Sequence, residues 1–551
     1  MNNKKNINED GSEMEPGSGR NNRYLLPLTF AVVLAIGVLI GVKIAPFSSG
    51  KPSYVSKGYS SSRIDDILNF ISSRYVDTIN VDSIIDDFVA AYLNDPETID
   101  ELFKKLDPHS SYIHKEDLVS FNEELDGNFD GVGIEFNIVD DTILVVAALS
   151  GGPSEKLGIK AGDKIILIGD SIVAGNGITN EKVVGKLRGK KGSTVDVKIK
   201  RIGEKSLLDF NIVRDVIPIT SIDANYMVDD KTGYIKVNKF ASETPIEFAD
   251  ALQGLVNKGM KNLVLDLRGN PGGYLQGAVE LADEFLAGTP LIVYTEGRAV
   301  GKDEYRAGKN GLFEQGNLVV LVNEFSASAS EILAGALQDN KRATIIGRRS
   351  FGKGLVQQVY DLNDSSAIRL TIARYYTPSG KSIQRPYDEG VDAYYEQYIS
   401  IVQNGGELPD SLKNNKNLDW GIHPDINVPI DSSPMIKTLN YLFNRTIIQE
   451  FGYSIYSENP QSFSKYTDIK DFNNNYEFSA ELFSRFTKYA LAHDPDKALT
   501  EAEIIAARQK IEIGIKAFIA RQKWGNNGYY SFINQIDDAY LKAIEHITGK
   551  M

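Results

Sequence analysis

The sequence has no cysteine and few histidines. Its 551 residues include 5 histidines, and 74 acidic side chains outnumber 60 basic ones. The missing cysteines exclude disulfides, cysteine–zinc sites and thiol nucleophiles, and there is no HExxH motif to build a histidine metal site. We therefore expect no metal and no cofactor. A net charge of −14 without a basic run argues against nucleic acid as a partner. Any chemistry must use serine, threonine, lysine, carboxylates or backbone groups.

The N-terminal region combines a polar leader with one apolar run. Residues 1–23 are rich in Asn, Gly and Ser and predict a disordered tail. Leu25 to Val42 is an apolar run of 18 residues, which is the lower limit for a membrane-spanning helix. We predict an uncleaved single-pass anchor over residues 24–46, at the cell inner membrane, with the following domains extracytoplasmic (periplasmic). The alternative is a cleaved signal peptide, which would make the protein secreted.

Two small domains are predicted after the anchor. Residues 60–115 show helical periodicity and predict an N-terminal helical module, with helices at about 64–75, 84–92 and 97–106. Residues 116–215 hold short β-rich runs separated by glycines. Two short helical stretches interrupt these runs, near 153–157 and 179–188. This pattern predicts a compact domain of about 90 residues, which is within the usual size range.

The last part of the chain, residues 436–551, is mostly helical. Thr500 and Glu503 have the spacing of a capping box that opens a helix, whose apolar stripe extends through Phe518. Gly525 is the predicted end of that helix. No catalytic pattern occurs in this region, so we predict a packing or assembly module.

Strands and helices alternate within residues 233–376. The predicted strands are 233–237, 263–267, 291–294, 318–322 and 344–347, and the intervening helices include 275–287 and 329–339. Repeated βαβ units imply a largely parallel, buried sheet with helices on its faces. Ligands of such sheets bind at the loops that follow the strands' carboxyl ends. Two Gly/Ser-rich loops occur there, at 268–273 and 323–330.

Ser328 is the candidate nucleophile. It lies in the segment S-A-S-A-S-E at 326–331, where a loop leads into an Ala-rich helix. Its hydroxyl would lie beside the positive end of the helix dipole, and the amide of Ala329 could help to stabilise an oxyanion. The alternative is structural, because Ser328 and Glu331 have the spacing of a capping box and such boxes are common.

A nucleophilic serine needs a base, and all five histidines lie outside the strand–helix region. Lysine can serve when burial lowers its pKa. Lys353 lies between two glycines at the start of an apolar strand, where residues 353, 355 and 357 would share one face. Gln357 could thus orient the amine. The alternative is an exposed lysine in a glycine turn.

The segment D-L-R-G-N-P-G-G at 266–273 follows a predicted parallel strand. Its Gly272 and Gly273 would expose backbone amides and admit a substrate backbone. The alternatives are a tight turn or a phosphate loop, although the GxxxxGK[ST] pattern of a phosphate loop is absent. The segment is therefore a candidate for a second oxyanion donor.

Together these motifs resemble the carboxy-terminal processing peptidases, also called tail-specific proteases. The resemblance covers about residues 60–435 and includes three further segments, 106–112, 375–380 and 423–426. One departure is Gly269, where many members carry Asn. The resemblance implies an α/β multidomain protein, with a crotonase/Clp-protease-like core over 216–435, an inserted PDZ domain, an N-terminal helical module and a C-terminal helical extension.

The resemblance also implies roles for individual residues. Members are serine proteases with a Ser–Lys dyad, which here falls on Ser328 and Lys353, with Gln357 supporting the lysine. The implied oxyanion donors are the amide of Ala329 and a glycine amide, that of Gly272 or Gly273. No metal and no cofactor are implied.

Residues 116–215 fit the family's PDZ domain. The run L-G-I-K-A-G-D-K-I at 157–165 resembles the PDZ signature. In a PDZ domain, loop amides receive a peptide carboxylate and an edge strand pairs with the peptide. The implied peptide-binding residues are Gly131, Val132, Gly133, Ile134, Phe136, Val184 and Leu187.

We therefore expect an extracytoplasmic serine endopeptidase that captures protein C-termini with its PDZ domain and cleaves near them through an acyl-enzyme intermediate. Its partners would be protein or peptide substrates and, through one N-terminal helix, the membrane; the sequence leaves open whether it forms a homo-oligomer. One alternative is a PDZ-bearing peptide-binding adaptor with an idle protease core, against which the intact Ser, Lys and Gln argue. Another is a crotonase-type enzyme acting on thioesters, against which the PDZ pattern argues.

Overall fold

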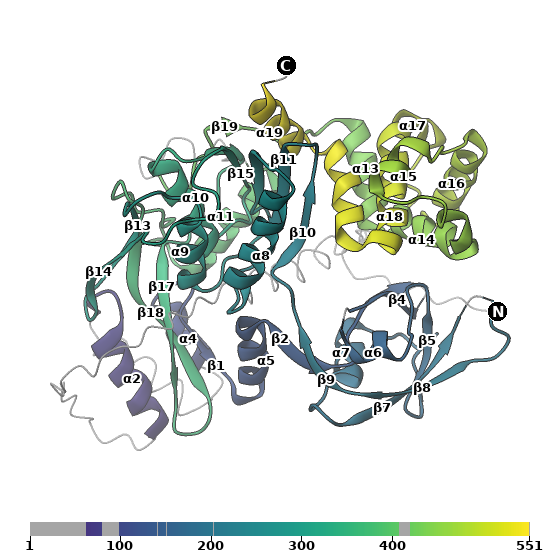
Figure 1. The fold of residues 1–551 in the computed structure, drawn as a ribbon. Coiled ribbons are helices and arrows are strands. Elements are labelled where there is room, and N and C mark those ends of the chain that lie inside the picture. Colours follow the sequence, from purple (N-terminus) through teal and green to yellow (C-terminus); the bar gives the residue numbers. More distant parts are fainter. Residues whose placement is uncertain are drawn as a thin grey trace, which may run out of the picture.

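The computed structural model describes residues 62–79, 99–139, 141–149, 151–201, 203–406 and 419–549. The predicted tail, the predicted anchor at 24–46 and the predicted helix at 84–92 lie outside these residues. Within them, no helix combines the length and the apolar character that crossing a membrane requires. Figure 1 shows a mixed α/β core on one side and, on the other, a small β domain below a bundle of C-terminal helices.

A six-stranded sheet forms the centre of the core. In spatial order its strands are β10 (Ile222–Met227), β11 (Thr232–Val237), β12 (Asn262–Asp266), β15 (Asn317–Val322), β16 (Thr344–Gly347) and β19 (Ile426–Asn427). β11 to β19 are parallel, and β10 pairs antiparallel at one edge. The predicted largely parallel sheet is thus confirmed.

Both faces of this sheet are covered, which is why its strands consist of continuous apolar runs. One face packs against α8 (Thr244–Asn257), α9 (Leu275–Asp283) and α10 (Ala329–Asp339). The other face packs against α19 (Asp538–Thr548), through Tyr540, Ala543 and Ile547. Successive side chains along each strand point to opposite faces of the sheet and so join the two hydrophobic clusters in turn.

A second, antiparallel sheet lies beside the first. Its strands are β1 (Ser111–Ile113), β18 (Ala367–Tyr376), β13 (Leu291–Gly297) and β14 (Gly301–Arg306) in spatial order, with β17 (Leu355–Asp361) also paired to β18. The prediction that strand 291–294 joins the parallel sheet is wrong, because β13 pairs antiparallel with β14 and β18. A short apolar run has the same appearance in either kind of sheet.

The domain that the sequence predicts to be a PDZ domain, called the PDZ domain below, is a six-stranded antiparallel structure. Its elements are β3 (Ile134–Val139), β4 (Thr142–Ala148), α6 (Pro153–Lys156), β5 (Lys164–Ile168), β6 (Ser171–Ile172), α7 (Asn180–Leu187), β7 (Thr194–Lys200) and β8 (Leu208–Val213). The domain has a hydrophobic core of its own. The ribbon of β2 (Asn128–Gly131) and β9 (Asp215–Pro218) connects it to the rest of the chain.

The remaining N-terminal helices pack against the second sheet, and one inserted helix packs against Ala327 and Phe351. In chain order these helices are α2 (Ser62–Arg74), α4 (Ile99–Lys104), α5 (Lys115–Asp126) and α11 (Val391–Gln403). α2 and α4 share a hydrophobic cluster with β18 through Ile368 and Leu370. Both helices occur where the sequence predicted them.

The C-terminal extension is helical, as predicted. It consists of α13 (Pro434–Asn444), α14 (Ile447–Glu458), η3 (Pro460–Phe463), α15 (Ile469–Asn475), α16 (Ala480–Ala492), α17 (Glu501–Ala506), α18 (Arg508–Ile533), η4 (Asn534–Ile536) and α19. The Thr500–Glu503 capping box is present. The prediction of a single helix after this capping box is wrong, because the helix is interrupted at Ala507. At Gly525 the backbone leaves helical geometry (φ 60°, ψ −150°), and α18 then continues to Ile533.

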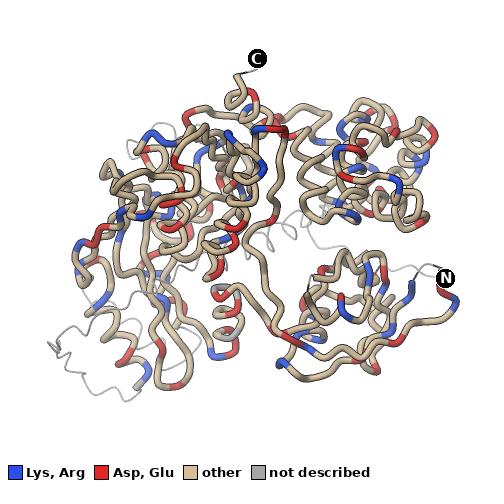
Figure 2. Tube along the Cα trace, viewed as in Figure 1, with Lys and Arg blue, Asp and Glu red and all other residues tan. Residues whose placement is uncertain are grey.

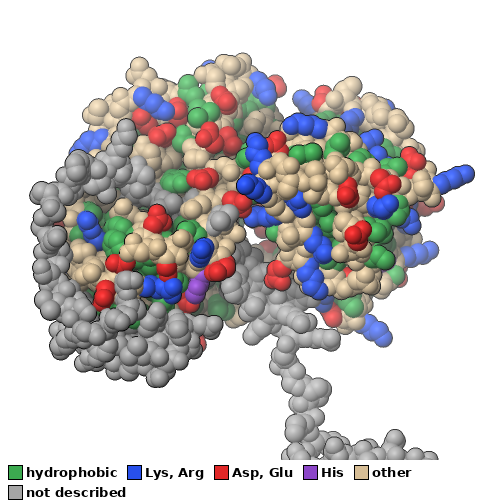
Figure 3. Space-filling view, turned by 90° about the horizontal axis from the view of Figure 1, so that it is seen from below, with side chains coloured by type: hydrophobic (Ala, Val, Ile, Leu, Met, Phe, Trp, Pro, Cys, Tyr) green, Lys and Arg blue, Asp and Glu red, His purple; other side chains and the backbone are tan. Residues whose placement is uncertain are grey.

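Charges of both signs are interspersed over the described residues (Figure 2). On the face drawn in Figure 3, neither the basic nor the acidic side chains of the described residues gather into one large patch.

Candidate active site

Ser328 lies in a strained turn at the start of α10. Its backbone has φ 56° and ψ −116°, a region that residues other than glycine rarely adopt. Such strain persists only where the surrounding structure enforces it, and it occurs most often at functional sites. The Ser328 hydroxyl is buried and has no hydrogen-bond partner within the described part of the chain.

The two neighbouring serines differ from Ser328. The Ser326 hydroxyl donates to the Leu267 carbonyl (2.9 Å) and the Ser330 hydroxyl to the Asn270 carbonyl (3.0 Å). The Ser328 amide donates to the Glu331 carboxylate (2.8 Å). A capping role for this pair thus accounts for the bond between the Glu331 carboxylate and the Ser328 amide. It does not account for the Ser328 hydroxyl, which makes no hydrogen bond to a described residue.

Glu331 holds the Ser328 and Lys353 segments together. One carboxylate oxygen accepts the amides of Ser328 (2.8 Å) and Lys353 (2.9 Å). The other accepts the Ser350 hydroxyl (2.5 Å) and the Gly352 amide (2.7 Å). Burial raises the pKa of Glu331 to about 7, although these four hydrogen bonds act in the opposite direction.

Tyr375 joins the same two segments from the other side. Its hydroxyl lies 3.1 Å from the Ser328 carbonyl oxygen and also contacts the Lys353 carbonyl oxygen. The backbones of Ser328 and Lys353, 25 residues apart in the chain, are therefore fixed side by side at both their amides and their carbonyls.

Lys353 is fully buried, and its Nζ donates to Gln357 Oε1 at 3.1 Å. Burial lowers the pKa of Lys353 well below its usual value, and the nearby Arg369 guanidinium lowers it further. A neutral amine is the form that can accept a proton. Strand β17 has an irregular register between Val356 and Gln357, yet the predicted contact between Lys353 and Gln357 is formed.

The loop at 266–273 packs directly against Ser328. A Cβ on Gly272 would lie 2.7 Å from the Ser328 Cβ and 2.9 Å from the Ala329 nitrogen. The Gly272 amide already donates to Asn270 Oδ1 (2.9 Å). The amides of Gly273 and Ala329 donate no hydrogen bond to any described residue. Of the two glycines, Gly273 is thus the one whose amide is open to an oxyanion, and Gly272 supplies the close approach.

His109 is a neighbour of this site that the sequence did not predict. It is buried, its Nε2 lies 3.3 Å from the Tyr394 hydroxyl, and its ring centroid is 6.3 Å from that of Phe351. Burial and the charge of Lys353 lower the pKa of His109 well below its usual value. The pairing of β1 with β18 places the segment that carries His109 beside the site. In the sequence, only the family resemblance of residues 106–112 pointed to this segment. No hydrogen bond joins His109 to Ser328 within the described residues.

The implied peptide-binding residues lie on three adjoining elements of the PDZ domain. Gly131 ends β2, Val132 and Gly133 form the turn to β3, and Gly133 has φ 73°. Strand β3, which carries Ile134 and Phe136, is an edge strand of its sheet. On α7, Leu187 is buried and Val184 is 37% exposed. An edge strand beside a helix is the arrangement that peptide addition requires.

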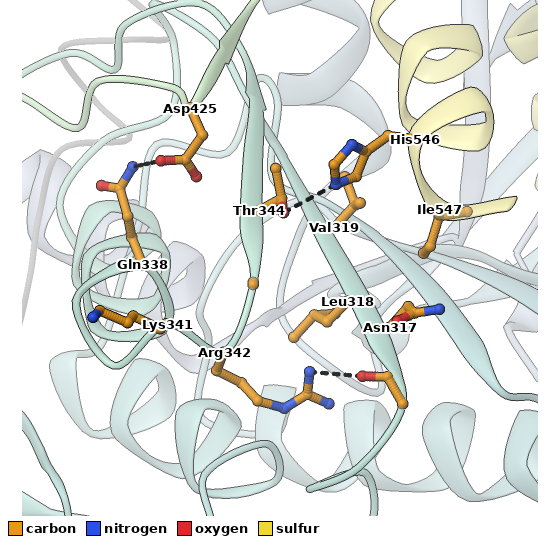
Figure 4. A pocket seen from close by; sticks show the side chains of 12 residues that line it. Asn317, Leu318, Val319, Gln338, Lys341, Arg342, Thr344, Asp425, His546 and Ile547 are labelled. Carbon is orange, nitrogen blue, oxygen red and sulfur yellow. Dashed lines mark hydrogen bonds between the residues drawn. The ribbon is translucent and has the colours of Figure 1, made fainter. Parts of the chain in front are cut away.

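A separate cavity lies at the opposite end of α10 (Figure 4). Its volume is about 470 Å³, and it is lined by residues from β15, β16, α10 and α19. Several of its polar side chains bond within the lining: Gln338 to Asp425 (2.9 Å), His546 to Thr344 (3.2 Å) and Arg342 to the Gly316 carbonyl (2.9 Å). None of the predicted site residues lines it.

Comparisons with known proteins point to one family of peptidases. Residues 231–395 match the profile of peptidase family S41, and residues 438–525 match a family of unknown function, DUF8443. The core and its site define a serine-type peptidase.

The chain belongs to the carboxy-terminal processing protease family. It is 37% identical over 328 residues to the carboxy-terminal-processing protease of Bartonella bacilliformis, an alignment that covers 59% of this chain and 72% of that protein. It is 31% identical over 405 residues to the carboxy-terminal processing protease CtpA of Bacillus subtilis, covering 73% and 80%. Among solved structures it is similar to the photosystem II D1 C-terminal processing protease, with 27% identity, a TM-score of 0.39, and coverage of 67% of this chain and 94% of the other.

Proposed function

We propose that this protein cleaves proteins near their carboxy termini, with Ser328 as the nucleophile and Lys353 as its base. The observation that carries the proposal is the joint fixing of the two residues by Glu331 and Tyr375, with the Ser328 hydroxyl left free of structural bonds. The neutral amine of Lys353 takes the Ser328 proton as the oxygen attacks the peptide carbonyl. Gln357 orients that amine.

The proposed reaction proceeds through an acyl-enzyme. The amides of Ala329 and Gly273 receive the negative charge that develops on the carbonyl oxygen. The tetrahedral intermediate then breaks its C–N bond, and the Lys353 ammonium returns the proton to the leaving amine. Water, deprotonated by Lys353, attacks the ester on Ser328 and releases the acid together with the free hydroxyl.

The PDZ domain is proposed to capture the substrate's free carboxy terminus. Strand β3 has an unpaired edge, and the glycine turn before it presents backbone amides to a carboxylate. We also propose that the protein works outside the cytoplasm, tethered by residues 24–46. The apolar run in the sequence supports this location, and the absence of cysteine fits a compartment in which free thiols are oxidised.

Replacement of Ser328 tests the catalytic proposal. Ser328→Ala should abolish cleavage of an unstructured peptide with an apolar carboxy terminus, while circular dichroism and thermal melting show a retained fold. Ser454→Ala, in α14 of the C-terminal extension, is the matched control: its hydroxyl donates to the Phe451 carbonyl (2.8 Å), so we expect a loss of no more than about 1.5 kcal/mol of stability and retained cleavage. Wild-type rates in Ser328→Ala would refute the assignment. Peptide binding without cleavage by the wild type would favour the adaptor alternative.

A further inference from the structure

The C-terminal extension reaches the loop that carries the proposed oxyanion glycine. Helix α19 begins after Asp537, whose Oδ1 accepts the Tyr540 amide (2.8 Å) as an N-cap. The same carboxylate accepts Nη1 of Arg268 at both of its oxygens, at 2.6 and 2.7 Å. Arg268 and Asp537 are 269 residues apart in the chain.

Arg268 is also held from its other side. Its Nε and Nη2 donate to the Asp266 carboxylate at 2.9 and 2.7 Å, and its own carbonyl accepts Lys236 Nζ at 2.8 Å. The Arg268 side chain is only 16% exposed, so these charged hydrogen bonds are formed largely away from water. Such bonds are shorter and stronger than neutral ones. Arg268 is therefore clamped between the end of β12 and the start of α19.

The position of Arg268 determines where the following loop residues lie. Two residues further on, the Asn270 carbonyl accepts the Ala327 amide (3.0 Å), and its Oδ1 accepts the Gly272 amide (2.9 Å). Gly272 in turn contacts Ser328. A shift of Arg268 would therefore reach the Gly273 amide through one continuous set of bonds.

We propose that Asp537 is a positioning residue for the oxyanion loop. Through Arg268 it fixes residues 268–273, and so it keeps the Gly273 amide directed at the substrate carbonyl. This inference rests on the proposed function. It gives the C-terminal extension, whose sequence carries no catalytic signal, a part in the reaction.

The test is Asp537→Asn. Asparagine caps a helix about as well as aspartate, so α19 keeps its N-cap while the ion pair with Arg268 is lost. We expect kcat to fall about tenfold to a hundredfold with KM little changed, because the displaced amide serves the transition state. The matched control is Asp468→Asn, which makes the same change at the N-cap of α15, whose carboxylate accepts the Asp471 amide (2.8 Å) and does not contact the core. This control should keep wild-type kcat. Equal kcat values in the two variants would overturn the proposal.

A second measurement does not depend on cleavage. Hydrogen exchange in peptides spanning 266–274 should be faster in Asp537→Asn than in wild type or Asp468→Asn, because the Gly269 and Gly272 amides are hydrogen-bonded in this loop. Unchanged exchange there would also overturn the proposal. Ser328→Ala, assayed beside these variants, distinguishes a failure of the proposed function from a failure of this inference. Wild-type cleavage in Ser328→Ala would refute the proposed function. The exchange comparison would still decide whether Asp537 holds the loop.

Discussion

At the scale of single residues, burial acts on two ionisable groups of opposite sign within one site. Lys353 and Glu331 are both enclosed, and burial disfavours the charged form of each. The pKa of Lys353 is lowered and that of Glu331 is raised to about 7. Burial thus favours the neutral amine of Lys353, the form that the proposed base requires.

Activity should rise with pH. The neutral fraction of Lys353 increases as the pH passes its lowered pKa, and only ionised Glu331, with a pKa of about 7, accepts all four of its donors. Both changes act in the same direction. The measurement is kcat/KM from about pH 5 to about pH 9, with chemistry rate-limiting. Lys353→Arg, which stays charged throughout this range, should be inactive at every pH. A flat wild-type profile would contradict the role of Lys353.

Sequence reasoning selected the candidate catalytic side chains but not their surroundings. Ser328, Lys353 and Gln357 could be selected because their residue types and local spacing carry the chemistry. The linking role of Glu331, the proximity of His109 and the distinction between Gly272 and Gly273 depend on contacts between segments that are distant in the chain. No local pattern encodes such contacts.

At the scale of elements, periodicity predicted most helices and strands of the core, because strands buried on both faces are long apolar runs. It did not assign β13 to its sheet, because that depends on the partners β14 and β18. Nor did it show the break at Ala507, since the apolar stripe of the extension continues through both helices. The pairing of a strand and the interruption of a helix depend on tertiary contacts, whereas the periodicity of apolar residues reflects only the local sequence.

The approach of the 266–273 loop to α10 requires a glycine at position 272. Gly272→Ala would place a Cβ 2.7 Å from both the Ala327 carbonyl oxygen and the Ser328 Cβ, at φ 101°, so we expect loss of cleavage and a lower melting temperature. The control is Gly254→Ala in α8, where no atom lies within 4 Å of the new Cβ. That change should raise stability by about 0.5–1 kcal/mol and leave cleavage unchanged. Equal cleavage rates in the two variants would show that the close approach is unnecessary.

At the scale of the whole molecule, the extension contacts the PDZ domain as well as the core (Figure 1). Arg521 Nη2 reaches both carboxylate oxygens of Glu135 on β3, at 2.7 and 2.9 Å. Leu144 and Val146 of β4 belong to the hydrophobic core of the extension. Ile134 and Phe136 pack against the core of the PDZ domain itself, so the extension contacts β3 through Glu135, on the face opposite these two residues. The sequence predicted only a packing module, because it does not show which surface such a module covers.

Glu135→Gln tests this contact. Glu135 is 42% exposed, so the cost in stability should not exceed about 1 kcal/mol. Hydrogen exchange should nevertheless become faster in β3 and β4, because the domain is held less firmly against the extension. Glu181→Gln, on the exposed side of α7, is the control and should leave exchange in these strands at the wild-type level. The same exchange in both variants would mean that packing alone holds the domain.

Helix α19 limits how far the chain can be truncated from its C-terminal side. Tyr540, Ala543 and Ile547 cover the strand residues Val264, Val319 and Leu321. A chain shortened to end near residue 435 would bare this apolar surface to water, and contiguous patches of that kind promote aggregation. We therefore expect the segment that matches the peptidase family to aggregate when it is produced alone. A shortened form intended for enzymology or crystallisation must retain residues 538–548.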